Sequence, residues 1–589
     1  FPVGGRPLVN LSFAINYAIH GERTSGYQLT NLAFHVACGL LVFGVMRRAL
    51  LLSGATLART AQPLALATAL LWIVHPLNSE VVNYLSQRTE SAMAMAFLLT
   101  IYCSLRAAAA PGADALWLGI GVVACAAGMA SKESMVTAPI VVLIFDRVFL
   151  FASSREAART RPYFYLGLAA SWLVLGGLLL QAPRAPSNGF DTTLTSPWTY
   201  LLNQAVMIAH YLRLVVWPDR LAIYYGWVQP VTLGDVWPFV LLVGALAGAS
   251  VWCLLRAPRV GFLTASVFIT LAPTSSILPI GAEVGAERRM YLPMVALTAL
   301  VVLAGHAAWR RLAIRPYMTP AAQRFVQIGG IGLVVCVTAA LAVRTFLRTE
   351  DYASALTLAR GTVAAWPNGA AHKILGTELF NRFGPTDEAL RELRTAADSM
   401  APAAFDLGIA LLSAGDTSGA LAVLEAFVRA EPRLATTATA HKRIGQIYEN
   451  REQWDQARLH YERSLTLAPS DAEVRLGLAL ALSHLQAYGA AVPHYEAVIA
   501  KQPGSFVAWM GLGVAHAGEG GYAAAVTAFE TAVRLNPADI AGRVNLARAR
   551  LDAGDVDGAL AAARDAAATA PNDPDVQRIL GAVAAAHQP

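Results

Sequence analysis

The chain changes its physical character near residue 350, and this change restricts its fold more than any other feature. Before residue 350, most of the chain consists of apolar stretches close to the length of about 20 residues that a helix needs to cross a bilayer. After it, four prolines recur at intervals of 34 residues: Pro469, Pro503, Pro537 and Pro571. A period of 34 residues is typical of helix-turn-helix repeats that stack into a solenoid. We therefore predict an all-α protein, with a polytopic membrane helix bundle in residues 1–350 and an α-solenoid in residues 351–589.

Composition and charge support a division at residue 350. Hydrophobic residues make up 56% of the chain and charged residues 14%, and the mean hydropathy of +0.47 is typical of a membrane protein. Residues 1–350 hold 25 Lys and Arg against 13 Asp and Glu, whereas residues 351–589 hold 20 against 26. The positive charge therefore belongs to membrane loops, and it does not indicate a nucleic-acid partner.

Ten stretches are apolar enough to be membrane spans: 29–46, 62–77, 91–107, 114–130, 134–151, 163–181, 236–255, 260–280, 290–309 and 325–343. A further apolar segment, 198–217, carries Asn203, His210 and Arg213. Counting this segment as a full crossing would break the alternation of the later loops. We therefore predict that it is a re-entrant or interfacial helix.

The distribution of Lys and Arg predicts which side of the membrane each loop faces. One set of loops holds fourteen Lys and Arg residues: 47–61, 106–113, 147–162, 256–259 and 310–324. The loops on the opposite side hold ten. Because cytoplasmic loops are enriched in Lys and Arg, we place this set in the cytoplasm. The other loops and the solenoid then face the non-cytoplasmic side: 1–28, 78–90, 131–134, 218–235 and 281–289.

The repeats match the signature of the tetratricopeptide repeat. One repeat fills nearly every signature position: Trp509, Leu512, Gly513, Ala525, Phe529, Ala532 and Pro537. Repeats are regular from residue 438 onward and less regular between 369 and 437, which gives about six to seven in total. Residues 352–367 resemble the second helix of a repeat that has no first helix. We therefore expect the solenoid to stack directly on the end of the last span.

The first motif that suggests chemistry runs from His75 to Glu90 at the end of a span. Glu80, Tyr84 and Arg88 are four residues apart, so a continuous helix would align them on one face. A carboxylate, a phenol and a guanidinium at a membrane surface are suited to orienting a hydroxyl and binding phosphate. The alternative is a proline-initiated helix with an interfacial salt bridge.

Two further charged motifs lie on the predicted non-cytoplasmic side. Lys132 and Glu133 separate two apolar runs, and the alternative to a functional role is a turn with a buried Asp146–Arg147 pair nearby. Arg288 and Arg289 open a late span, where positive charge is unusual. A lipid phosphate would compensate these two charges, and pairing with Glu283 and Glu287 is the competing account.

Several kinds of chemistry have no signature in the sequence. All five cysteines lie in apolar spans, so no disulfide framework or cysteine-based metal site is predicted. No phosphate-binding glycine loop, zinc-binding HExxH helix or serine-nucleophile elbow is present. No soluble nucleotide-sugar domain is visible, so a sugar donor would have to be linked to a lipid.

The order of these motifs resembles a known family. Together with the repeats, five segments carry the resemblance: 6–13, 26–32 with His35, 75–90, 132–134 and 287–293. The chain resembles the transmembrane and tetratricopeptide-repeat O-mannosyltransferases and their bacterial relatives, within the GT-C class of glycosyltransferases. The Arg-rich, Lys-poor and Ala-rich composition suggests a bacterial source, and hence the inner membrane.

The resemblance implies a polyprenyl- or dolichyl-phosphate donor, usually of mannose, and transfer to Ser or Thr of exported proteins with inversion at the sugar carbon. A carboxylate would take the proton of the acceptor hydroxyl, and cations would stabilise the departing phosphate. The implied roles are an acceptor site supported by Glu80 and Glu90, and a donor-phosphate site formed by Arg88, Lys132, Arg288, Arg289 and Tyr291. Four other residues belong to the same motifs: Arg6, His75, Glu133 and Glu287. No metal-binding residues are predicted, and the sequence leaves open whether a divalent metal takes part. The repeats would bind the polypeptide acceptor.

In this class the principal catalytic acid lies in the first outward loop, upstream of the Arg6-Pro7 segment. The chain begins with Phe1 at that segment, so we expect a first span and an acidic loop to precede it. Without that acid, the alternative function is a non-catalytic, membrane-anchored repeat scaffold for envelope or secretion assembly. A transporter of lipid-linked sugar is a third possibility, which the lack of an inverted duplication disfavours.

Overall fold

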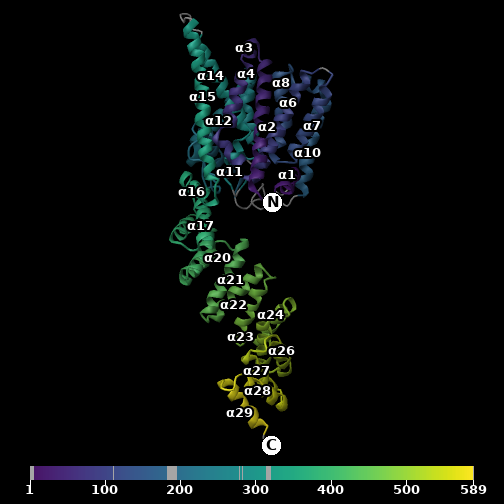
Figure 1. The fold of residues 1–589 in the computed structure, drawn as a ribbon, viewed down its shortest axis with the longest axis vertical. Helices are drawn as coiled ribbons and strands as arrows, with labels where there is room; N and C mark the ends of the chain where they lie inside the picture. Colours follow the sequence, from purple (N-terminus) through teal and green to yellow (C-terminus); the bar gives the residue numbers. More distant parts are fainter. Residues whose placement is uncertain are drawn as a thin grey trace. The chain divides into compact units, whose positions relative to one another are not determined.

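The structure is a computed structural model that describes residues 5–110, 112–181, 195–276, 279–280, 283–313 and 320–587, with side chains omitted for 312–313 and 320–327. The regular structure of these residues is helical, as the sequence predicts (Figure 1). The chain divides into two compact units, Phe1–Glu378 and Leu379–Pro589. The first unit thus continues past the change in composition at residue 350.

The membrane-spanning part of the first unit consists of these helices: α1 (Pro7–His20), α2 (Thr24–Leu51), α3 (Ala55–Ala58), α4 (Ala61–Ile73), η1 (Pro76–Asn78), α5 (Ser79–Asn83), η2 (Leu85–Gln87), α6 (Arg88–Ala108), α7 (Asp114–Met129), η3 (Glu133–Thr137), α8 (Ala138–Phe149), α9 (Ser154–Thr160), α10 (Pro162–Gln181), α11 (Pro197–Val216), α12 (Leu233–Arg256), α13 (Pro258–Leu271), η4 (Glu287–Met290), α14 (Pro293–Ala313) and α15 (Pro320–Asp351).

The repeats consist of these helices: α16 (Ala355–Ala365), α17 (Gly369–Phe383), α18 (Asp387–Ser399), α19 (Ala403–Ser413), α20 (Thr417–Ala430), α21 (Ala435–Asn450), α22 (Trp454–Leu467), α23 (Ala472–His484), α24 (Tyr488–Lys501), α25 (Phe506–Gly518), α26 (Tyr522–Leu535), α27 (Ile540–Asp552), α28 (Val556–Thr569) and α29 (Pro574–Ala586).

Helices lie in every stretch that the sequence predicts as a span, but in the stretch 260–280 helix α13 ends at Leu271, and residues 277–278 lie outside the described residues. Among the described residues, six helices are long and apolar enough to cross a membrane: α2, α6, α10, α12, α14 and α15. Two bent pairs bring the number to eight if each pair is one span, α4 with η1 and α5, and η3 and α8 with α9. Helices α7 and α13 are shorter apolar helices. Segment 198–217 is the continuous helix α11, which is not among these candidates.

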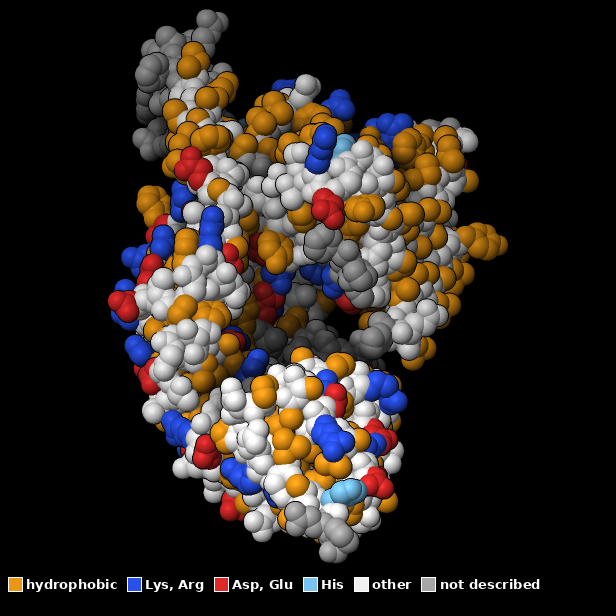
Figure 2. Space-filling view, turned by 60° about the horizontal axis from the view of Figure 1, so that its bottom comes forward, with side chains coloured by type: hydrophobic (Ala, Val, Ile, Leu, Met, Phe, Trp, Pro, Cys, Tyr) orange, Lys and Arg blue, Asp and Glu red, His pale blue; other side chains and the backbone are white. Residues whose placement is uncertain are grey.

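The outer helices expose hydrophobic side chains, as a protein surrounded by lipid must. The most apolar window of α12 is only 6% buried and that of α15 is 0% buried. Leu173 and Leu180 on α10 are 79% and 87% exposed. Figure 2 shows hydrophobic side chains covering the flank of the first unit on the side of α7 and α10. Because such a surface is unstable in water, the first unit is a membrane domain.

One polar group is held inside this apolar bundle by neighbouring helices. Asp146 of α8 accepts hydrogen bonds from Ser104 of α6 and Tyr165 of α10, each at 2.6 Å, and lies 3.5 Å from Arg161. The alternative of a buried Asp146–Arg147 pair is wrong, because Arg147 is exposed and Asp146 has other partners. A buried carboxylate needs several partners, and three helix segments supply them here.

The repeats share one backbone feature at the turn between their two helices. In each described repeat this turn contains a residue with positive φ: Gly384, Gly415, Glu452, Gln486, Gly520 and Gly554. Glycine adopts this conformation without strain, whereas Glu452 and Gln486 adopt it at some cost. The last four of these turns are 34 residues apart, so the backbone repeats with the period of the prolines.

Small residues allow the two helices of a repeat to approach closely. A methyl group built on Gly513 of α25 would come within 2.5 Å of the Phe529 ring of α26. Gly445 of α21 faces the ring of Tyr461 in the same way. Each glycine thus makes room for a buried aromatic side chain of the second helix, and its replacement would push the helices apart.

We expect the repeats to lose stability in mild acid, because two histidines are buried side by side between two helices. Nδ1 of His441 and Nδ1 of His460 are 3.0 Å apart between α21 and α22. Burial lowers the pKa of both imidazoles to about 4 from the usual 6.5. The unfolded chain therefore takes up protons below pH 6.5 that the folded chain does not bind until about pH 4. We expect a loss on the order of 3 kcal/mol as the pH falls through this range.

Hydrogen exchange of the amides in α21 and α22 measures this loss. The double variant His441→Gln/His460→Gln is the control and should show a weaker dependence on pH. Equal protection of the native chain at pH 7 and pH 4.5 would contradict the expectation.

The first repeat helix packs directly on the membrane domain, in agreement with the expectation from residues 352–367. Helix α16 begins four residues after α15 ends. The Trp366 ring that follows α16 packs against His210 of α11 and Tyr225, with ring centroids 4.8 and 5.3 Å apart. No long linker therefore separates the last span from the first repeat helix.

Candidate active site

A group of buried charged residues lies where three short segments meet α15. These segments are η1 with α5, residues 283–286, and η4, which ends just before Pro293 starts α14. Proline is favoured in the first turn of a helix, which fixes η4 outside the span. We define the ionic site as Glu80, Glu283, Glu287, Arg288, Arg289 and Arg348.

Arg288 is the centre of the ionic site. Its Nη1 donates to Oε1 of Glu80 at 2.7 Å, and its backbone N–H donates to Oε2 of the same carboxylate at 2.9 Å. Its Nη2 donates to Glu283. The side chain of Arg288 is 19% exposed, whereas that of Glu80 is 3% exposed. Together the two carboxylates raise the pKa of Arg288 against the opposing effect of burial, so the guanidinium remains charged.

Arg289 points into the protein and is held mainly by neutral groups. It donates to the carbonyl oxygen of Glu283 at 2.9 Å and to Tyr200 and Gln204 of α11, and its Nη2 is 3.7 Å from the Glu283 carboxylate. Glu283 thus contacts both arginines of the motif. The sequence analysis gave pairing of the two arginines with Glu283 and Glu287 as the alternative to a lipid phosphate. The pairing with Glu283 is present, but the second carboxylate that pairs with Arg288 is Glu80 and not Glu287.

Glu287 lies behind the arginines and is fully buried. Its carboxylate accepts hydrogen bonds from the Ala222 backbone N–H at 2.6 Å and the Tyr225 hydroxyl at 2.9 Å. Arg348 of α15 is its ion-pair partner at 4.0 Å and also pairs with Asp351 at 2.8 Å. Burial raises the pKa of Glu287 to about 7 despite Arg348. Glu287 therefore ties η4 to the last span.

A second pair of charge contacts involves the Lys132-Glu133 motif. Lys132 donates to the Glu90 carboxylate in a largely buried ion pair between η3 and α6. Arg6 lies 3.1 Å from Glu133, whose side chain is 49% exposed. Four of the predicted site residues therefore form two ion pairs, which join the start of α1 and α6 to the turn before α8.

Arg88 does not share a helix face with Glu80 and Tyr84, so that expectation is wrong. The backbone of Tyr84 is extended, and it separates α5 from η2 and α6. Arg88 is fully buried and donates to the Asn31 side chain at 2.8 Å and the Tyr27 carbonyl at 3.1 Å. Its guanidinium also lies over the Phe13 ring. In this structure Arg88 joins α1, α2 and α6, and it does not contact the ionic site.

His75 and Tyr291 are also engaged inside the helix bundle. His75 Nε2 lies 3.1 Å from the Val215 carbonyl, and its Nδ1 accepts from the backbone of Leu77, which shapes η1. The Tyr291 hydroxyl lies 2.7 Å from His35 Nδ1, and its ring packs against Trp72. Both residues position the segments that carry Glu80 and Arg288.

The sequence alone did not reveal the role of Arg348, which is evident only from its contact with Glu287. A single arginine near the end of an apolar helix resembles an ordinary boundary residue. The signal that distinguishes it is its burial, with 2% of the residue exposed, and burial depends on tertiary structure. No group of three His, Cys, Asp or Glu residues suited to a metal occurs in the part of the chain that the structure describes.

The ionic site has the chemistry of a phosphate-binding site next to a carboxylate. Guanidinium groups bind phosphate and carboxylate with similar geometry. Arg288 has five N–H donors in its side chain, and Glu80 and Glu283 use two of them. The partial exposure of Arg288 leaves an edge of the guanidinium available to a ligand.

Comparison with known proteins identifies relatives of both parts. Tetratricopeptide-repeat family models match residues 516–583 and, in three overlapping copies, 405–472, 442–506 and 476–540. Protein O-mannosyl-transferase Tmtc2 of Drosophila melanogaster is 29% identical over 230 residues, which cover 38% of this chain and 24% of that protein. Protein O-mannosyl-transferase TMTC2 of Homo sapiens is 31% identical over 149 residues, which cover 25% of this chain and 17% of that protein. The match thus spans a quarter or less of the length of these relatives.

Solved structures similar to this chain include a tetratricopeptide-repeat protein. The crystal structure of YrrB, a TPR protein with an unusual peptide-binding site, is 17% identical with a TM-score of 0.29 and covers 34% of this chain and 96% of its own. MamA from Desulfovibrio magneticus RS-1 is 20% identical with a TM-score of 0.22, and the match covers 35% of this chain and 97% of the MamA chain.

The fold and the ionic site define a polytopic membrane protein that carries a tetratricopeptide-repeat solenoid and a buried cluster of arginines and carboxylates. Its named relatives are protein O-mannosyl-transferases. Over the matched residues the chain is similar to protein O-mannosyl-transferases, and residues 405–583 match tetratricopeptide-repeat family models.

Proposed function

We propose that the protein transfers a sugar, mannose in the first instance, from a polyprenyl phosphate to Ser or Thr hydroxyls of exported proteins. The membrane domain would hold the donor, and the repeats would bind the polypeptide acceptor along their concave surface. The reaction would take place on the non-cytoplasmic side of the membrane, and in a bacterium this is the outer side of the inner membrane. The names of the relatives support the transfer of mannose to protein.

The observation that carries the proposal is the double contact of Glu283 with Arg288 and Arg289. A carboxylate that bridges two arginines occupies the place that a phosphate would take between the same two side chains. We propose that the donor phosphate displaces Glu283, while Glu80 continues to hold Arg288 in place. Glu80 is a positioning residue in this arrangement, because both of its oxygens already accept hydrogen bonds from Arg288.

In the transfer, the bond from the sugar carbon to the phosphate oxygen breaks and a bond to the acceptor oxygen forms. The hydroxyl proton passes to a carboxylate, and the departing phosphate gains charge that the guanidinium of Arg288 stabilises. Arg88 is buried against α1 and α2, so we assign it a structural role in this scheme. The Glu90–Lys132 pair would support the acceptor side from α6 and η3.

The test uses the protein expressed from its complete gene and reconstituted in vesicles. We expect transfer of radiolabelled mannose from mannosyl-phosphoryl-polyprenol to a Ser/Thr-containing exported protein, and no transfer from a nucleotide-linked mannose supplied alone. Absence of transfer, combined with restoration of a deletion strain by the repeats fused to an unrelated span, would support the scaffold alternative instead.

A further inference from the structure

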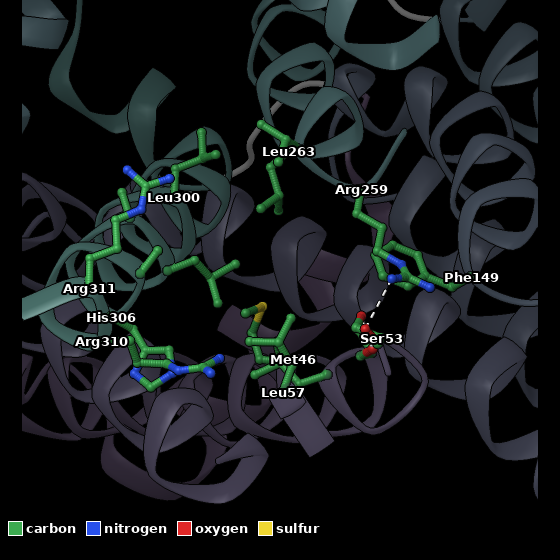
Figure 3. Close-up of a pocket in the computed structure, with 16 residues that line it drawn as sticks. Met46, Ser53, Leu57, Phe149, Arg259, Leu263, Leu300, His306, Arg310 and Arg311 are labelled. Atoms are coloured by element: carbon green, nitrogen blue, oxygen red, sulfur yellow. Dashed lines mark hydrogen bonds between the residues drawn. The ribbon is translucent and has the colours of Figure 1, made fainter. Parts of the chain in front are cut away.

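A second site lies at the end of the membrane domain away from the ionic site. Helix α2 connects the two regions: its His35 contacts Tyr291, the residue that follows η4 of the ionic site, and Leu51 ends the helix on the other side. Because a helix rises about 1.5 Å per residue, His35 and Leu51 are separated by roughly 24 Å along α2. A cavity of about 850 Å³ opens between the end of α2 and helices α3, α8, α13 and α14 (Figure 3).

The wall of this cavity is mainly apolar. Leu50, Leu263, Leu300 and Leu303 line it, together with Met46 and other small or aliphatic side chains. A smaller apolar cavity of about 80 Å³ shares Met46 and Leu263 with it and continues toward Leu292 at the start of α14. The continuous apolar lining is suited to a hydrocarbon chain that enters from the membrane.

Three arginines lie at the edge of the apolar wall of this cavity. Figure 3 shows Arg259 on one side of the cavity and Arg310 and Arg311, with His306, on the other. None of the 16 described residues that line the cavity is acidic. The positive charge therefore has no carboxylate partner within the lining, in contrast to the ionic site, where Glu80 and Glu283 neutralise the arginines.

The fold holds one of these arginines in place. Arg259 donates to the backbone carbonyls of Ser53 at 3.0 Å and Leu52 at 3.4 Å, just beyond the end of α2. These carbonyls have no partner within the helix, and the negative end of the helix dipole favours a cation there. Arg259 is thus fixed at the rim of the cavity, where an anion can reach it.

We infer that this cavity binds an anionic phospholipid of the surrounding leaflet. Its phosphate would lie between Arg259, Arg310 and Arg311, and its acyl chains would lie along Leu263, Leu300 and Leu303. Basic pockets between helices on the side of the membrane that carries positive loops are suited to anionic headgroups. The site is separate from the proposed donor site, because it lies at the other end of the membrane domain.

The experiment measures which lipids the full chain retains after purification from vesicles that contain both phosphatidylglycerol and phosphatidylcholine. Native mass spectrometry counts phosphatidylglycerol and phosphatidylcholine bound after a detergent wash. From vesicles that contain both lipids, we expect the native protein to retain phosphatidylglycerol at least tenfold over phosphatidylcholine. The triple variant Arg259→Gln/Arg310→Gln/Arg311→Gln should lose this preference.

The matched control removes three exposed arginines that do not line the cavity, Arg147, Arg155 and Arg159. It should keep the preference for phosphatidylglycerol. If the triple variant fails to fold, Leu263→Trp provides a second test, since it fills the apolar part and leaves the arginines in place. Leu263→Trp should also lose bound phosphatidylglycerol.

Three outcomes would overturn the inference. Equal retention of phosphatidylcholine would show a site for any hydrocarbon chain, without recognition of the headgroup. Loss of the preference in the control variant would show general attraction to a negative surface. Displacement of the lipid by inorganic phosphate alone would show a soluble-anion site in which the apolar wall has no part.

Discussion

Replacing Arg288 by alanine is expected to lower the rate of sugar transfer by at least about 100-fold, the usual cost of removing a group that stabilises charge in a transition state. Arg288 carries the partly exposed guanidinium of the ionic site, and Glu80 and Glu283 fix it from two sides. The loss should appear mainly in kcat, because the phosphate gains charge as the sugar leaves. Transfer of radiolabelled mannose by the reconstituted full-length protein measures this effect.

The matched variant is Glu283→Gln, which removes the carboxylate that competes with the phosphate. We expect it to retain transfer and to lower the KM for the lipid-linked donor severalfold, whereas Arg288→Lys should recover only part of the lost rate. An Arg288→Ala protein that folds and transfers mannose at the native rate would refute the assignment. So would a Glu283→Gln protein whose KM for the donor rises.

Replacing Lys132 by methionine is expected to destabilise the membrane domain by about 3–5 kcal/mol. This change leaves the Glu90 carboxylate, which is 4% exposed in its side chain, buried without its cation. Removal of one partner of a buried pair costs more than removal of both, because the remaining charge loses its solvation. Thermal unfolding in detergent measures the difference.

The double variant Glu90→Gln/Lys132→Met should recover most of this stability, which makes the comparison a double-mutant cycle. The exposed pair of Arg6 with Glu133 is the control, and Glu133→Gln should change stability by about 1 kcal/mol or less. Equal destabilisation by the single and double variants would show that Lys132 acts through packing and not through charge.

Much of the fold follows from periodicities in the sequence. The apolar stretches predict the helices of the membrane domain, and the 34-residue spacing predicts the paired helices up to α29. The site was less predictable. Glu80 and Arg288 were predicted as site residues from their types and positions, but the predicted alignment of Glu80 with Arg88 is wrong because Tyr84 breaks the helix. A local change in backbone direction has no strong signal in a single sequence.

The sequence by itself determined that the chain is helical and that apolar stretches are followed by repeats, because these properties depend on local composition and period. Only the tertiary structure decided the partners of those charges. Glu80 and Arg288 are separated by more than 200 residues, and Arg348 meets Glu287 across the bundle. Such pairs form because an ion buried among apolar helices is stable only beside an opposite charge, and packing of the whole bundle decides which one is in reach.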